Sequence, residues 1–171
     1  RRVLFRSTVG AFQIESRAQV AMLPRTQPRS LDDLTIQVSI VRPGPIVGGA
    51  VNPYVRRREA RRQDPNAPIA MPACVRDVLE ETLGVVLFQD QVIAVAKQMG
   101  GFSASQAETF RRAMSRKRSA QIMERYRQQF MDGAAARGVP PAEATTMFEN
   151  LLRSEEHTSE LQSRFGISYA V

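Results

Sequence analysis

Apolar residues recur at helical spacing in several separate stretches of the chain. The first stretch begins after Ser30, which forms a capping-box pattern with Asp33, and its apolar residues follow three and four positions apart up to Val41. This pattern predicts a helix that ends before the Pro-Gly-Pro corner of residues 43–45, because proline lacks the amide hydrogen that a continuing helix needs.

The second half of the chain carries further helical signals. Ser103 and Gln106 form another capping-box pattern, and the Gly-Gly pair before them ends the preceding apolar stretch. Four amphipathic stretches each predict a helix: residues 92–99, 107–114, 123–134 and 147–152.

The stretches between these segments are less regular. Residues 44–72 are rich in Gly, Pro, Asn and Arg, which indicates a long loop with room for a short helix across PYVRRREARR. The run GVVLF, residues 84–88, fits either a short buried strand or an extended entry into the next helix. The predicted fold is therefore mainly α, with a long Pro/Gly/Arg-rich loop and at most a short strand.

Composition narrows the class of partner. Lys and Arg number 24 against 17 Asp and Glu, which gives a formal charge of +7 and favours a polyanion, either nucleic acid or an acidic membrane surface. No apolar run approaches the roughly 20 residues of a membrane helix. A single cysteine, Cys74, excludes an intramolecular disulfide and fits a reducing compartment. We therefore expect a soluble, cytoplasmic protein.

Few residues have the spacing of a catalytic site. The chain has no phosphate-cradling GxxxxGK[ST] motif and no Cys/His metal cluster, and its one histidine is His157. Glu80 and Glu81 fit a solvated helix face better than an acid–base pair. No local spacing of carboxylates indicates a platform for two metal ions. An independent enzyme is therefore not expected.

Arginines are the more informative residues. They cluster at 56–58, at 61–62 and from 111 to 118, and their forked donors suit phosphate oxygens, although each cluster could equally be a solvated surface. Arg42 projects from the stiff RPGP corner, where a structural bond to a helix end is the competing interpretation. Tyr54 and Phe88 could stack on bases, but their spacing favours core positions.

Both ends of the chain have an unusual composition. Residues 1–7 (RRVLFRS) and 153–171, which include RSEEHTSELQS and ISYAV, resemble translated sequencing-library adapter rather than protein-coding sequence. We therefore predict that the genuine segment covers residues 8–152, which remains basic, and that His157 lies outside it.

The sequences of several motifs, and their order along the chain, resemble those of a known family. The matching segments include TVGAFQIESRAQVAMLPR, DDLTIQVSIVRPGPIVGGAVNPYVRRR, ETLGVVLFQDQVIAVAKQMGGFS, AETFRRAMSRKRS and FMDGAAARGV. Together they resemble the fingers region of bacterial C-family DNA polymerases, the DNA polymerase III alpha subunit family, over essentially all of residues 8–152. The first two stretches look closer to the error-prone branch than to the replicative subunit.

This resemblance implies a parent enzyme that extends a primer with deoxynucleoside triphosphates (dNTPs), using Mg²⁺ held by palm-domain aspartates. Those palm motifs are not found in this sequence, so we expect the chain to be inactive by itself. The implied partners are primer-template DNA and dNTPs, and a sliding clamp or other replication and repair proteins through the full-length parent.

The resemblance also implies which residues bind dNTP or DNA. The expected contacts come from basic side chains, with two glutamines in FQDQV supporting the site by hydrogen bonds. The expected set is Arg42, Arg56, Arg57, Gln89, Gln91, Arg111, Arg112 and Lys117. Two alternatives stay open: a free-standing basic helical module that binds nucleic acid without catalysis, and a scaffold for an acidic protein.

Overall fold

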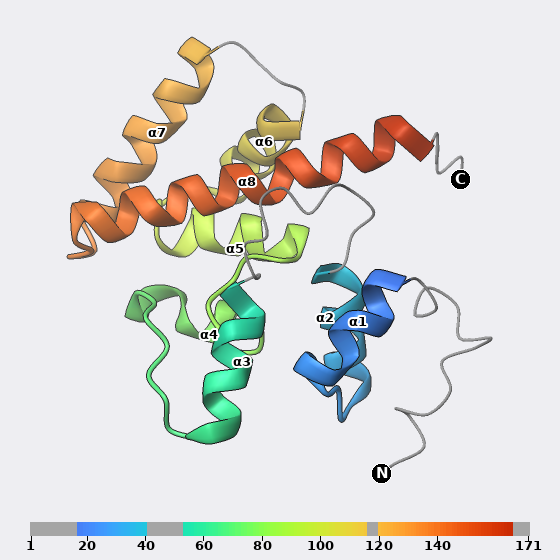
Figure 1. Cartoon of the computed structure of the whole chain (residues 1–171). Helices are drawn as coiled ribbons and strands as arrows, with labels where there is room; N and C mark the ends of the chain where they lie inside the picture. The colour runs from blue at the N-terminus through green and yellow to red at the C-terminus, as the bar shows by residue number, and fades with distance from the viewer. Residues whose placement is uncertain (1–16, 41–52, 116–119, 166–171) are drawn as a thin grey trace. The chain divides into compact units, whose positions relative to one another are not determined.

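The computed structural model describes residues 17–40, 53–115 and 120–165 of the chain, and all the regular elements in these ranges are helices (Figure 1). The mainly α fold is therefore confirmed. The chain divides into two compact units, residues 1–69 and 70–171, which are described separately below.

The first unit contains helices α1 (Arg17–Thr26), α2 (Leu31–Ile40) and α3 (Pro53–Gln63). The predicted cap of α2 is present: Ser30 Oγ accepts a hydrogen bond from the Asp33 amide at 3.1 Å. The Asp33 carboxylate reaches one residue further back than a standard capping box and accepts from the Arg29 amide at 2.7 Å. Val41, where we expected the helix to end, lies outside the described residues.

Helix α3 confirms the short helix expected across PYVRRREARR, within the stretch for which we predicted a long loop. Its arginine-rich sequence has little apolar character, but Tyr54 and Val55 are buried and fix the helix against its neighbours. The described part of the loop is thus limited to residues 64–72. The core interpretation of Tyr54 is confirmed by its burial.

Arg58 joins all three helices of the first unit. Its guanidinium donates to Asp33 Oδ1 at 2.7 Å, to the Tyr54 hydroxyl at 2.8 Å and to the backbone carbonyl of Thr26. Burial disfavours the charge of Arg58, but its hydrogen bonds and charge interactions with Asp33 and Tyr54 together outweigh burial and raise the pKa of the guanidinium. A second ion pair, Arg25 to Glu59 at 2.9 Å, links α1 to α3.

The second unit begins with a short 3-10 turn, η2 (Ala73–Val75), and helix α4 (Arg76–Leu79). Residues 85–88 then run without regular hydrogen bonding into α5 (Gln89–Gln98), so the alternative of a strand at GVVLF is wrong and the extended entry is right. Val86 and Leu87 are nevertheless buried, as their apolar character requires.

Three further helices follow: α6 (Ala104–Ser115), α7 (Ala120–Ala135) and α8 (Pro141–Phe165). The predicted capping box of α6 is confirmed, since the Ser103 hydroxyl accepts from the Gln106 amide and the Gln106 side chain accepts from the Ser103 amide. Gly138 has a φ of 72°, the left-handed conformation that commonly ends a helix, in the turn before α8.

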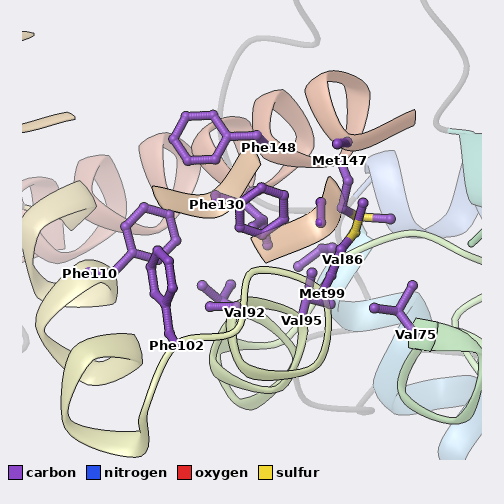
Figure 2. Packing of buried hydrophobic residues seen from close by; sticks show 14 of the residues in the cluster. Val75, Val86, Val92, Val95, Met99, Phe102, Phe110, Phe130, Met147 and Phe148 are labelled. Carbon is purple, nitrogen blue, oxygen red and sulfur yellow. The ribbon is translucent and has the colours of Figure 1, made fainter. Parts of the chain in front are cut away.

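Aromatic side chains form the centre of the second unit (Figure 2). Phe110 of α6 packs edge-on against Phe102 and stacks with Phe148 of α8, with ring centroids 5.4 and 5.8 Å apart. Phe130 of α7 contacts both Phe102 and Phe148. Since each ring comes from a different segment, this cluster locks α6, α7, α8 and the turn before α6 together.

Gly100 and Gly133 mark a close backbone contact in the second unit. A Cβ atom added at Gly133 would overlap the carbonyl group of Gly100, and one added at Gly100 would overlap the Phe130 ring. Helix α7 can therefore lie directly on the end of α5 only because neither position has a side chain.

Because of this contact, replacing a helical glycine with alanine should destabilise the chain, although that substitution usually stabilises a helix. An alanine in a helix interior is normally more stable than a glycine by about 1 kcal/mol. Gly133→Ala should instead destabilise the chain by about 2 kcal/mol or more, because the methyl group forces α7 away from Gly100. Urea unfolding followed by circular dichroism measures the change. Gln121→Ala at an exposed position of α7 is the control and should stay within about 0.5 kcal/mol of the wild type. A stabilised Gly133→Ala chain would contradict the packing described.

Candidate functional site

The structure brings some of the predicted binding residues together in the second unit and assigns others to the first unit. Gln89 at the start of α5 contacts Arg111 of α6, and Arg112 is the next residue of α6, whereas α3 belongs to the first unit. Arg42 and Lys117 lie outside the described residues. Arg56 and Arg57 lie on α3, and Gln89 and Gln91 lie in the first turn of α5.

A single carboxylate holds both arginines of α6. Glu108 Oε1 accepts from Arg111 Nη2 and from Arg112 Nε, each at 2.8 Å, and Glu108 Oε2 accepts from Arg111 Nε at 3.1 Å. Glu108 lies one helical turn before the two arginines, at spacings of three and four residues, so one side of α6 presents all three groups.

The two arginines differ in exposure. The Arg111 side chain is 20% exposed and also lies 3.4 Å from Gln89 Oε1, so it is fixed on two sides. The Arg112 side chain is 66% exposed, and in the described part of the chain its hydrogen bond uses Nε alone. Arg111 therefore anchors the cluster to α5, while Arg112 is its more solvent-exposed member. We refer to Gln89, Glu108, Arg111 and Arg112 as the α6 arginine cluster.

The charges of the cluster are strongly coupled. Hydrogen bonds from Arg111 and then Arg112 lower the pKa of Glu108 to about 2, against an ordinary value of 4.5. Glu108 is consequently ionised at neutral pH, and the three charged groups together carry one net positive charge.

Gln91 is a buried structural residue in the first turn of α5. Its side-chain oxygen accepts from the amides of Leu87 and Phe88, and its nitrogen donates to the carbonyl of Val78 and the hydroxyl of Thr82. All of these hydrogen bonds stay within the protein. Gln91 therefore fixes the extended entry to α5, and with it the position of Gln89, the first residue of that helix.

The arginines of α3 fall into two kinds. Arg58 is the structural link described above, whereas Arg56 is exposed. Arg57 is half-buried, and burial lowers the pKa of its guanidinium. Arg56 is therefore the residue of this triplet whose charge faces solvent most fully.

Other candidate groups show no catalytic arrangement. The described residues contain no group of three or more His, Cys, Asp and Glu side chains that could hold a metal ion. They therefore do not fit the Mg²⁺ ions that the family resemblance implies, and we assign no reaction step to a metal in this chain. Glu80 and Glu81 are exposed residues of the turn after α4. Burial raises the pKa of the Cys74 thiol, which keeps it protonated.

Two residues of functional interest were missed in the sequence. Glu108 could have been found, because an acid three and four positions before two arginines on a predicted helix is an ion-pair pattern. The structural role of Arg58 had no comparable signal, since its acidic partner is 25 residues away.

Comparison with known sequences identifies the class of domain. The bacterial DNA polymerase III alpha subunit finger domain matches residues 4–138, so the chain belongs to this family. None of the described helices has the length and apolar character needed to cross a membrane.

The curated relatives point to one branch of the family. The chain is 49% identical over 131 residues to a protein named error-prone DNA polymerase from Azoarcus sp.. It is 44% identical over 145 residues and 47% identical over 148 residues to the proteins of the same name from Burkholderia mallei and Mycobacterium bovis. These alignments cover 77%, 84% and 84% of this chain but only 12%, 14% and 13% of the relatives. The chain therefore spans a small part of the length of the polymerases it matches.

The α6 arginine cluster makes a prediction about protonation. Glu108 should remain mostly ionised at about pH 3.5, where an ordinary glutamate is largely protonated. Because its pKa is lowered on folding, the stability it contributes is complete above about pH 4.5 and is lost as the pH falls toward about 2. The ¹³C shift of the Glu108 carboxyl group, followed by NMR, measures this titration. Substituting Arg111 and Arg112 with Gln should raise the midpoint, and a wild-type midpoint above pH 4 would show that the ion pairs do not form in solution.

Proposed function

We propose that this chain is part of the fingers of a DNA-directed DNA polymerase of the error-prone branch and contacts the incoming dNTP and the DNA backbone. The observation that carries the proposal is the α6 arginine cluster, in which one carboxylate holds two guanidinium groups beside the start of α5. Membership of the finger-domain family supports the same conclusion.

Guanidinium groups suit this role for a geometric reason. Each presents a planar fork of donors that can engage two phosphate oxygens at once, and its charge persists at any physiological pH. Phosphoryl transfer depends largely on positioning and on neutralising charge that develops on the phosphate oxygens. Arg112, whose side chain is 66% exposed, is the more accessible of the two arginines for contact with phosphate, Arg111 would contact the same group, and Gln89 holds Arg111 in place.

The other predicted binding residues keep their predicted roles in the proposal. Arg56 and Arg57 of α3 would contact the DNA backbone, where contacts add affinity independent of sequence. Arg42 of RPGP and Lys117 beyond α6 keep the predicted role of dNTP or backbone contact. Gln91 acts indirectly through the segment that it holds.

The complete reaction is proposed for the parent protein. Primer extension there would use Mg²⁺ bound by palm aspartates outside this chain, and damage-tolerant synthesis would follow from the error-prone branch to which the named relatives belong. Primer-template DNA and dNTPs are the proposed partners, a sliding clamp would act through the full-length protein, and the location would be cytoplasmic.

The alternative of a basic module that binds nucleic acid without catalysis makes a different prediction. A module of that kind needs only a positive surface, so its affinity should depend on net charge rather than on particular arginines. The proposed polymerase role requires Arg111 and Arg112 in particular.

We therefore expect Arg112→Gln to weaken binding of primer-template DNA or dNTP to this chain by about tenfold, the effect of losing one charge-assisted hydrogen bond. If the contact is to the DNA backbone, the slope of log affinity against log salt should also fall by about one. Fluorescence anisotropy over a salt series measures both quantities. Arg125→Gln removes the same charge from an exposed position of α7 and should change either affinity by less than about twofold. Equal losses in the two variants would favour the charge-only module.

We also expect the purified chain to extend no primer when it is mixed with template, dNTPs and Mg²⁺, because its described residues contain no carboxylate cluster for the metal ions. Gel analysis of a labelled primer checks this, with a full-length error-prone DNA polymerase as the positive control. Template-dependent extension by the chain itself would refute the assignment of catalysis to absent palm residues.

A further inference from the structure

Glu108 is the unexplained member of the α6 arginine cluster. A surface that binds phosphate should avoid carboxylates, because a negative charge beside the ligand weakens the attraction. Glu108 nevertheless lies between the two guanidiniums and accepts hydrogen bonds from three of their nitrogen atoms, at 2.8, 2.8 and 3.1 Å. Its charge therefore opposes the proposed function unless its hydrogen bonds serve that function.

The geometry indicates what those hydrogen bonds accomplish. Arginine has a long side chain with many rotamers, and two adjacent guanidiniums repel each other. Glu108 engages Nε of each arginine, so it fixes the planes of both groups while it offsets part of their mutual repulsion. For Arg112 the hydrogen bond to Glu108 uses Nε, so among the described residues its two terminal nitrogens keep their donors for a phosphate, which they can bind in the forked manner.

We propose that Glu108 is a positioning residue, which pre-orients Arg111 and Arg112 for the triphosphate of an incoming nucleotide. This inference rests on the proposed function, since it presumes that the two arginines contact the triphosphate. The same arrangement lowers the conformational cost of binding, because the side chains are already ordered before the ligand arrives.

The competing interpretation is an ordinary surface ion pair. Pairs at spacings of three and four residues on a helix contribute little to stability and need no functional role. The two interpretations predict opposite changes in the affinity for a triphosphate when Glu108 is removed. If Glu108 is only a surface acid, its removal adds one net positive charge and should tighten binding of any polyanion. If Glu108 positions the arginines, its removal should weaken triphosphate binding despite the added positive charge.

The test measures binding of fluorescent dATP and of a single-stranded oligonucleotide to this chain. We expect Glu108→Ala to weaken dATP binding about fivefold and to leave oligonucleotide binding unchanged or tighter. Glu108→Gln keeps an acceptor oxygen without the charge and should recover part of the loss. Glu124→Ala is the matched control, since it removes an exposed acid that pairs with Arg127 three residues away on α7. It should not weaken dATP binding.

Two results would overturn the inference. One is dATP binding by Glu108→Ala that equals or exceeds the wild type, as in the Glu124→Ala control. The other is an equal loss for dATP and the oligonucleotide, which would indicate a general structural defect. Circular dichroism verifies the helix content of each variant. If Glu108→Ala does not fold, dATP binding by Glu108→Gln is compared with the wild type instead. Weaker binding supports the positioning role, and unchanged or tighter binding refutes it.

Failure of the proposed function would be recognised separately. A double variant, Arg111→Gln with Arg112→Gln, should lose dATP binding, and adding Glu108→Ala to it should cause no further loss. If the double variant binds dATP as well as the wild type, the arginines do not contact the triphosphate and the proposed function fails. If the double variant loses binding while Glu108→Ala does not, only the role of Glu108 is refuted.

Discussion

The helices of the second unit depend on one close backbone contact, between Gly100 after α5 and Gly133 within α7. With no side chain at either glycine, α7 lies directly on the end of α5, and Phe130 covers Gly100 and reaches the rings of Phe102 and Phe148. The same aromatic cluster holds α6 through Phe110. Helix α6 also packs directly against α5 and α8, and this packing places Arg111 beside Gln89 at the start of α5.

Arginine–carboxylate pairs occur in both units but serve different purposes. Arg58 is 19% exposed, and its donors are directed to Asp33, Tyr54 and backbone carbonyls of the chain itself. Arg112 is 66% exposed and shares a carboxylate with its neighbour. A guanidinium whose donors are all used inside the protein stabilises the fold, whereas one held by Nε and left exposed at its terminal nitrogens can still bind a ligand. Exposure thus separates two roles that the arginine-rich sequence shows as one kind of cluster.

How much the sequence could predict depended on the range of the interaction. The caps at Ser30 and Ser103 were correct because a capping box is made by residues three apart. The strand alternative at residues 84–88 was wrong because a short apolar run carries no period, and the buried Gln91 fixes that segment in an extended form. The use of Gly133 as a contact surface, and of Arg58 as a link to Asp33, requires knowledge of the tertiary fold.

The candidate site combines a local part and a distant part. Glu108, Arg111 and Arg112 are neighbours on one helix, and their spacing is visible in AETFRRAM. Gln89 joins them from 22 residues away, only because α5 and α6 pack together. We infer that this division has a mechanical consequence. An ion pair within one helix moves with that helix, whereas the contact to Gln89 breaks if α6 shifts relative to α5. The hydrogen bond from Arg111 to Gln89 thus depends on the packing of the two helices, whereas the hydrogen bond from Arg112 to Glu108 lies within α6.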